Sequence, residues 1–231
     1  KIIITASGGP FLKRKNFKNI KINDALNHPN WKMGKKISID SSTMVNKVFE
    51  VIEAKKIFNL NMSQIDILIN PNSYVHSLVI FNNGTIKILA HENTMDIPIF
   101  NSIHRNNGEI SYNINKLNYK KIKNLNLEEP SIKQFKTLKI LKLIPDNNSL
   151  FETILITIND ELVDMFLKKK IEYKKISTYL MKIINFKKFK KYCNVTPKSV
   201  NQIFEAQNDA KKFVNNYLKK FYDQTFLYFS F

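Results

Sequence analysis

The stretch "KKISIDSSTMVNKVFEVIEA" (residues 35–54) marks the change from strand to helix on which the expected fold rests. Residues Lys35–Ile39 are predicted to form a strand, and Thr43–Phe58 carry apolar side chains at helical spacing. Between them, Asp40–Thr43 are four consecutive residues of the types that accept the free backbone N–H groups at a helix start. We therefore expect a junction whose helix is capped by these side chains.

One capping side chain is enough for a helix, so four leave spare hydroxyls beside a positive helix terminus, where a phosphate can bind. Asn46 and Lys47 lie four and three residues before Glu50, which places all three on one side of the helix. The pattern predicts an anion held by Ser41, Asn46 and Lys47. Glu50 would then lie one turn deeper, beside a divalent metal that separates it from the anion. The alternative is an ordinary capped helix with a Lys47–Glu50 ion pair on its surface.

The flanking sequence indicates an α/β fold. "KIIITASGGPF" (1–11) is a β-branched run that enters a Gly-Gly-Pro turn. "IDILINP" (65–71) and "SLVIFNNGTIKILA" (77–90) read as further strands, the last two joined by an Asn-Asn-Gly turn. From residue 150 onward the apolar spacing is helical and glycine is absent. We expect an α/β catalytic domain with a mixed sheet, followed by a small all-α helical C-terminal domain.

A Lys- and Asn-rich stretch with two prolines separates these parts and is predicted to be a linker that crosses a surface. The expected boundaries are 1–125 for the catalytic domain, 126–149 for the linker, 150–222 for the helical domain and 223–231 for an apolar tail.

Composition limits the class of protein. With 231 residues, of which 43% are hydrophobic, the chain can build a core. Its single cysteine, Cys193, excludes an internal disulfide framework and a cysteine-based zinc site, which fits a reducing compartment. No apolar run approaches the roughly 20 residues of a membrane-spanning helix, so no membrane partner is expected.

The formal charge of +18 raises the alternative of a basic RNA-binding module. Only two of the 37 basic residues are arginines, although arginine forks are the side chains best suited to phosphate recognition. Lys, Asn, Ile, Phe and Tyr are all frequent, which indicates drift toward AT-rich codons. The densest cluster, "KIINFKKFKKYC" (182–193), is expected to be a helix with a solvated lysine face. No nucleic-acid partner is expected.

Three motifs resemble the 1-deoxy-D-xylulose 5-phosphate reductoisomerase family in order and spacing. They are "TASGGPF" (5–11), "HPNWKMGKKISIDSSTMVNK" (28–47) and "PNSYVHS" (71–77). "NTMDIPIF" (93–100) and "INDELVDMFLKKKI" (158–171) extend the similarity to about residue 221.

The resemblance implies roles for individual residues. In that family a serine of the Ser-Gly-Gly-Pro-Phe turn and the Ser, Asn and Lys of the following helix start hold the substrate phosphate. These positions match Ser7, Ser41, Asn46 and Lys47. The glutamate three residues after the lysine, here Glu50, is a metal ligand.

The resemblance also places a histidine and a tryptophan on a loop that closes over the substrate, and these match His28 and Trp31. Plain anchors of the loop are the alternative for both. His76 also matches a family histidine, but a lone histidine on a strand can be a satisfied core residue, and we leave it outside the catalytic set. Positions near the nicotinamide cofactor match Met33, Gly34 and Met95.

The implied reaction converts 1-deoxy-D-xylulose 5-phosphate to 2-C-methyl-D-erythritol 4-phosphate in the non-mevalonate route to isoprenoid precursors. It uses NADPH and a divalent metal, Mg²⁺ or Mn²⁺. The resemblance further implies a homodimer paired through the catalytic-domain sheet. The implied location is the bacterial cytoplasm, with a plastid-like organelle as the alternative.

The sequence also departs from the family pattern. It has no Gly-rich dinucleotide turn and no acidic Asp-Ser-Glu motif, the source of two further metal ligands in the family. We interpret the chain as a segment that is inactive alone; the alternative is a catalytically dead remnant that acts as a dimerising interaction module. Asn70 stands where the family usually has a histidine. One family motif has two asparagines; Ile156 stands in place of the first, and only the second, Asn159, is present.

Overall fold

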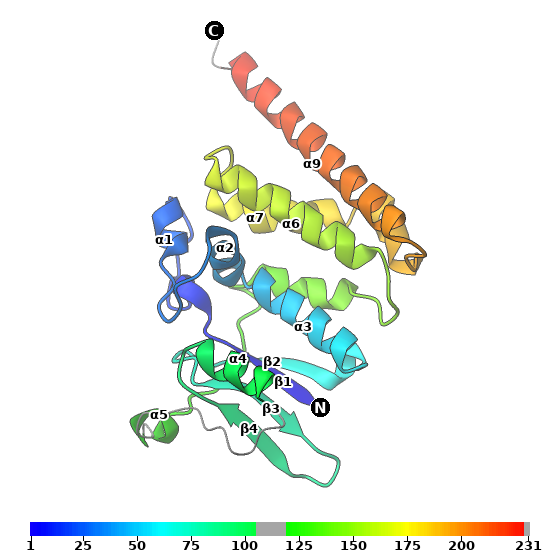
Figure 1. The fold of residues 1–231 in the computed structure, drawn as a ribbon. Coiled ribbons are helices and arrows are strands. Elements are labelled where there is room, and N and C mark those ends of the chain that lie inside the picture. Colours follow the sequence, from blue (N-terminus) through cyan, green and yellow to red (C-terminus); the bar gives the residue numbers. More distant parts are fainter. Residues whose placement is uncertain (105–118, 229–231) are drawn as a thin grey trace.

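The computed structural model describes residues 1–104 and 119–228, with a mixed four-stranded sheet at one end (Figure 1). The strands stand in the order β2-β1-β3-β4. β1 runs parallel to β2 and antiparallel to β3, and β3 pairs antiparallel with β4. Their bounds are β1 Ile2–Ala6, β2 Ile65–Ile69, β3 Val75–Ile80 and β4 Ile86–Ala90. The expected α/β fold with a mixed sheet is confirmed.

Helix α3 (Val45–Ile57) covers one face of this sheet. Val51 and Ala54 of the helix form a buried cluster with Ile65 of β2. Figure 1 shows three helices on the other side of α3 from the sheet, namely α6 (Phe151–Leu167), α7 (Tyr173–Ile184) and α9 (Val200–Tyr228). The helix therefore lies between the sheet and the helical C-terminal part of the chain.

The predicted strand at Lys35–Ile39 is wrong, because these residues begin helix α2 (Lys35–Thr43). The buried residues of α2 include Ser38, Ile39 and Ser42, which recur at helical spacing. Two of these three residues are polar, so the spacing of apolar residues in the sequence did not predict which face of α2 is buried. The Ser38 hydroxyl donates to the Gly34 carbonyl at 2.9 Å, which satisfies a polar side chain inside the first turn.

The expected capping of α3 by Asp40–Thr43 is also wrong, because these residues end α2 instead. The hydroxyls of Ser42 and Thr43 donate back to the Ile39 carbonyl at 2.7 and 3.1 Å. Met44 then turns the chain in the left-handed conformation, with φ of 63°, and precedes α3 without a side-chain cap. The junction is a break between two helices.

The Gly-Gly-Pro turn after β1 packs against this break. Gly9 begins the 3-10 helix η1 (Gly9–Phe11) with φ of 63°, a conformation that disfavours residues with a side chain. A Cβ atom on Gly9 would lie 2.9 Å from the Ser41 carbonyl oxygen. The missing side chain therefore allows the turn to touch the end of α2.

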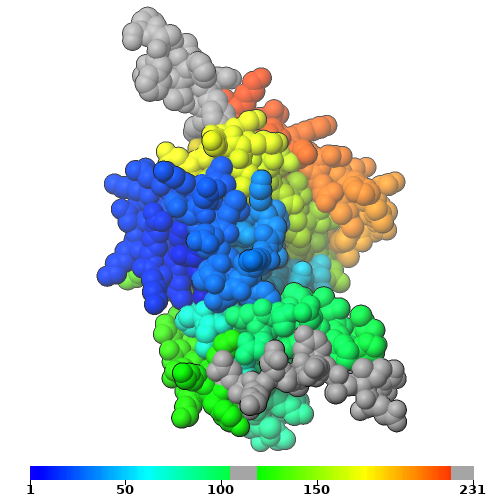
Figure 2. Space-filling view, turned by 60° about the vertical axis from the view of Figure 1, so that its left-hand side comes forward, coloured from blue at the N-terminus to red at the C-terminus, as the bar shows by residue number. Residues whose placement is uncertain are grey.

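The C-terminal part is helical, as predicted. Its helices are α6 Phe151–Leu167, α7 Tyr173–Ile184, α8 Lys187–Lys190 and α9 Val200–Tyr228. The lysine-rich cluster is not one helix, because α7 ends before Phe186, whose backbone is extended. Figure 2 shows the blue N-terminal residues against the yellow region of α7. In the interior, the rings of Phe11 and Tyr173 have centroids 5.0 Å apart.

Part of the predicted surface linker is core. The 3-10 helix η3 (Lys136–Leu143) buries Leu138 and Ile140 in the cluster that also contains residues of α2, α6 and α7. A 3-10 helix places every third residue on one face, and in η3 this face carries Lys136, Lys139 and Lys142. Only this lysine face agrees with the predicted surface linker. The domain boundaries themselves stay a prediction.

The remaining elements are short. They are α1 Ile22–Leu26, η2 Met62–Gln64, α4 Asp96–Ile103, α5 Tyr119–Lys123 and η4 Lys191–Asn194. Of the predicted apolar tail, residues 229–231 lie outside the described part. Among the residues described, no helix combines the length and apolar character needed to span a bilayer.

We expect Gly9→Ala to lower the free energy of unfolding by about 2–4 kcal/mol, because it adds a backbone clash to an unfavourable φ. Gly84, with φ of 84° and open space around its Cβ position, is the matched control. Gly84→Ala should cost only about 1–2 kcal/mol. Urea denaturation of both variants measures the difference, and equal losses would contradict the proposed contact with Ser41.

Candidate active site

A cavity of about 530 Å³ opens between the turn after β1, the loop that follows α1, the first turn of α3, and β3. It brings together nine of the ten residues singled out in the sequence. These are Ser7, His28, Trp31, Met33, Ser41, Asn46, Lys47, Glu50 and Met95. Gly34 lies outside the lining, at the start of α2. Their individual roles stay predictions.

His28 is held in one protonation state by the backbone. Its Nδ1 atom lies 3.2 Å from the Asn30 amide and 3.1 Å from the Trp31 amide, and both amides donate to it. Since Nδ1 accepts, we assign the proton to Nε2, which lies 3.0 Å from the Ser7 hydroxyl oxygen. Burial lowers the pKa of His28, which agrees with a neutral ring.

This arrangement orients Ser7. Its hydroxyl oxygen accepts from His28 Nε2 and from the Gly9 amide at 3.1 Å. Two accepted bonds leave the hydroxyl hydrogen as the remaining donor. Because Ser7 lines the cavity, that hydrogen is available to an anion there.

Asn46, Lys47 and Glu50 form a connected group on α3. Lys47 Nζ donates to Glu50 Oε2 and to the Thr5 carbonyl, both at 2.5 Å. Asn46 Nδ2 donates to Glu50 Oε1 at 2.6 Å. The Lys47 side chain is only 9% exposed, so the alternative of a surface ion pair does not describe it. An ammonium has three hydrogens, and two are used here, which leaves one for a ligand.

The start of α3 adds backbone donors. The first N–H groups of a helix have no partner inside it, and Met44 provides no side-chain cap. Met44, Asn46 and Lys47 all line the cavity. The first turn of α3 therefore combines free amides, the positive end of the helix dipole and the Lys47 charge.

Asn30 fixes the loop that carries His28 and Trp31. Its Nδ2 atom donates to the Pro71 carbonyl at 2.7 Å and to the Ser73 hydroxyl at 2.8 Å. These bonds connect the loop to the turn between β2 and β3. Asn30 thus attaches the loop to this turn by two hydrogen bonds.

His76 belongs to the cavity lining, although the sequence argument left it outside the site. Its ring meets Trp31 edge to face, with centroids 6.4 Å apart, and stacks on His91 at 3.7 Å. Burial lowers the pKa of His76, and its hydrogen bond to the His91 carbonyl partly offsets this. The alternation of β3, in which Val75 faces the core, was the available signal that His76 faces away from it.

The site offers one carboxylate to a metal ion. Glu50 is the only acidic side chain in the lining, and the described residues contain no cluster of three His, Cys, Asp or Glu side chains with metal-binding geometry. A hard cation such as Mg²⁺ takes about six oxygen ligands, often including waters and substrate oxygens. Glu50 therefore fits as one ligand, and the described residues do not form a complete metal site.

Two family models match this chain. Residues 1–58 match the 1-deoxy-D-xylulose 5-phosphate reductoisomerase C-terminal domain, and residues 92–213 match the DXP reductoisomerase C-terminal domain. A curated 1-deoxy-D-xylulose 5-phosphate reductoisomerase from Pelagibacter ubique is 52% identical over 205 residues, which cover 88% of this chain and 53% of the relative. One from Persephonella marina is 39% identical over 222 residues, which cover 95% and 58%.

A solved structure agrees with these matches. DOX-P reductoisomerase in complex with NADPH, fosmidomycin and magnesium superimposes with a TM-score of 0.86 at 30% identity. The superposition covers 95% of this chain and 55% of that one. The chain thus spans about half the length of the curated relatives it matches.

The free energy of unfolding should fall as the pH is lowered below about 6.5, the pKa of an unfolded histidine. Between that value and the lower folded-state pKa of His28, the unfolded state holds more protons than the folded state. The stability is therefore fully present above this window and is lost as the pH falls through it. Urea denaturation at pH 7.5 and about pH 5.5 measures the loss.

His28→Gln should reduce this pH dependence, because glutamine does not titrate. His104→Gln, at a histidine outside the cavity, is the matched control and should leave it unchanged. An unaltered pH dependence in His28→Gln would contradict the assigned neutral ring.

Proposed function

We propose, because this chain belongs to the 1-deoxy-D-xylulose 5-phosphate reductoisomerase family, that it supplies the substrate-binding part of such an enzyme. The reaction converts 1-deoxy-D-xylulose 5-phosphate to 2-C-methyl-D-erythritol 4-phosphate with NADPH, in the formation of isoprenoid precursors. The observation that carries the proposal is the convergence of Ser7, Asn46, Lys47 and Glu50 on one cavity.

The substrate phosphate is the group that this cavity suits best. Ser7 has a free hydroxyl hydrogen, Lys47 has a free ammonium hydrogen, and α3 has free amides, all on the same cavity. Ser41 adds a hydroxyl at the end of α2. These donors hold a doubly charged group at a point remote from the reacting carbons, which positions the sugar chain.

Glu50 is the proposed metal ligand. A divalent cation such as Mg²⁺ or Mn²⁺, when bound, polarises the carbonyl oxygen of the substrate. Asn46 and Lys47 hold one carboxylate oxygen each, so the orientation of Glu50 is fixed before any ligand arrives. The carboxylate then faces the cavity with lone pairs to spare.

The loop from His28 to Met33 is the proposed cover of the substrate. His28 and Asn30 tie it to the turn after β1 and to the turn before β3. Trp31 and Met33 contribute apolar surface to the cavity, and Met95 contributes more from the start of α4. Such surface excludes water and suits the nicotinamide ring of NADPH.

A homodimer is proposed through the sheet. β4 is an edge strand, and its apolar side chains Ile86, Ile88 and Leu89 are 55%, 47% and 57% exposed. An edge with exposed apolar residues favours pairing with another chain. The bacterial cytoplasm is the proposed location, because the matched relatives come from bacteria, with a plastid-like organelle as the alternative.

Lys47→Ala should raise the KM strongly, with a cost of about 2–3 kcal/mol in kcat/KM, since it removes a charge-assisted contact to the phosphate. The measurement needs a complete enzyme, for example a chimera with the N-terminal half of the Pelagibacter ubique relative. Lys55→Ala is the matched control, because Lys55 is also a buried lysine of α3 but donates to the Pro145 carbonyl, away from the cavity.

Glu50→Gln should lower kcat by a larger factor and shift activity to higher Mn²⁺ concentrations, because it removes a ligand charge and keeps the shape. Steady-state kinetics across a manganese titration measure this. A Glu50→Gln enzyme with an unchanged metal response would remove Glu50 from the metal site.

The 231-residue chain alone is expected to show no substrate-dependent oxidation of NADPH, because its cavity supplies a single carboxylate. An absorbance assay with added manganese checks this. Sustained turnover by the chain alone would show that the remaining ligands lie within it.

A further inference from the structure

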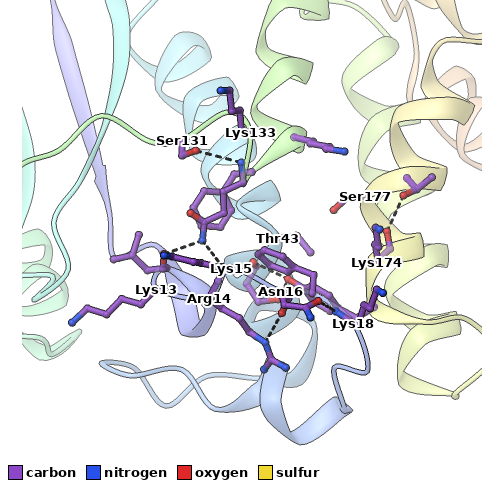
Figure 3. A pocket seen from close by; sticks show the side chains of 18 of the residues that line it. Lys13, Arg14, Lys15, Asn16, Lys18, Thr43, Ser131, Lys133, Lys174 and Ser177 are labelled. Carbon is purple, nitrogen blue, oxygen red and sulfur yellow. Dashed lines mark hydrogen bonds between the residues drawn. The ribbon is translucent and has the colours of Figure 1, made fainter.

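A second and larger cavity, of about 910 Å³, lies where three distant segments meet (Figure 3). They are the loop at residues 12–18, residues 131–136 and the first turns of α7. Its volume is in the range of small-molecule sites. Ser42 and Thr43 line it, whereas their neighbours Ser41 and Met44 line the candidate active site. The two cavities are therefore separate and share the turn between α2 and α3.

The lining of this basic pocket contains seven basic side chains and no acidic one. Over the chain the ratio is 37 basic to 19 acidic residues, and a neighbouring cavity beside α1 still includes Glu172. In the described part of the chain, none of the seven forms a salt bridge. Drift toward lysine adds positive charge everywhere, but it does not remove carboxylates from one concave site.

The seven basic side chains differ in how available they are to a ligand in the pocket. Figure 3 shows Lys13 and Lys133 extending outward from the group. Arg14 is engaged by its own loop, where Nε donates to the Asn16 carbonyl at 2.8 Å and the guanidinium lies over the Phe11 ring. Four ammonium groups remain, those of Lys15, Lys18, Lys136 and Lys174. Four such charges match a ligand with more than one phosphate.

The floor of the pocket is aromatic. The rings of Phe17 and Tyr173 lie parallel, with centroids 6.4 Å apart and planes within 9°. Tyr173 is buried, and its hydroxyl donates to the Ser42 carbonyl at 2.8 Å, so the ring is held in place. The half-buried Met181 extends this apolar surface, and the buried Phe135 packs beneath it. A free phosphate would leave it uncovered, whereas a ligand with a planar ring would bury it.

We propose that this pocket binds a small organic polyphosphate with an aromatic ring, of the chemical class of a nucleoside diphosphate or triphosphate. The phosphates contact the lysines, and the ring packs on the floor formed by Phe17 and Tyr173. A nucleic acid is less well suited, because its backbone needs an extended track of charge and this site is concave. The proposal is independent of the reductoisomerase activity, since direct binding tests it.

The test is calorimetric titration of the chain with ATP, compared with adenosine and with inorganic triphosphate. ATP should bind most tightly, because only it uses both the lysines and the aromatic floor. Lys136→Gln combined with Lys174→Gln should weaken ATP binding by about tenfold. Lys139→Gln combined with Lys175→Gln, on the same two helices but outside the lining, is the control. It changes the net charge equally and should alter affinity by less than about twofold.

Several results would overturn the proposal. Equal weakening in the two double variants would assign binding to the general charge of the chain or to the other cavity. Inorganic triphosphate binding as tightly as ATP would remove the aromatic ring from the ligand class. Tighter binding of a single-stranded oligonucleotide than of ATP would make the surface a nucleic-acid interface. Absence of saturable ATP binding would reject the site.

Discussion

The break between α2 and α3 at Met44 is the constraint on which both cavities depend. A helix end leaves carbonyl groups without partners, and burying them unpaired is costly. Here the Ser42 carbonyl accepts from the Tyr173 hydroxyl at 2.8 Å, and the Thr43 carbonyl accepts from the Thr137 hydroxyl at 2.5 Å. Both donors come from residues far along the chain. The 3-10 helix η3 and helix α7 thus complete the hydrogen bonding of the turn that carries the candidate active site.

A second connection holds the same region. Asp40 of α2 is almost fully buried, and burial raises its pKa, although the ion pair with Lys36 and the amide of Asn159 partly offset this. Lys36 also reaches Asp160 at 2.9 Å, so α2 and α6 are joined through charged groups. This gives Asn159 a structural role in the described residues. Ile156, where the family usually has an asparagine, is 38% exposed and needs no such partner.

Much of the fold followed from the sequence pattern, and the failures have two different causes. The strands predicted within residues 1–11, 65–71 and 77–90 and the helical C-terminal part are confirmed. The strand predicted at Lys35–Ile39 and the single helix predicted over 182–193 are wrong. The helix α2 instead buries Ser38, Asp40 and Ser42, so its buried face looked like polar surface. The helix η3 was missed because it is short and rich in lysine. Local patterns thus missed a buried face that is polar and a short 3-10 helix whose exposed lysines are closely spaced.

The residues that line the candidate active site could be predicted from the sequence better than the hydrogen bonds between them. The motif residues converge on one cavity, and the family assigned from them is the one that the comparisons show. Ser41, Asn46 and Lys47 line the cavity as expected, but the expected cause is wrong. The hydroxyls of Ser42 and Thr43 bond back to α2 and do not cap α3. The bonds of His28 to two backbone amides depend on the folded loop, which no local pattern encodes, whereas the alternation of β3 was an available signal for His76.

The lysines of this chain fall into two groups, many that are exposed to solvent and a few that are buried. The net charge of +18 fits the interpretation of drift toward lysine, since an exposed lysine costs little wherever it arises. Lys47 and Lys55 are different, because each is buried and donates to the carbonyl of a distant segment. A desolvated ammonium persists only where partners compensate for lost water. The proposed contact of Lys47 with an anion would thus be strong and poorly screened, whereas contacts of the exposed lysines in the basic pocket would weaken with salt.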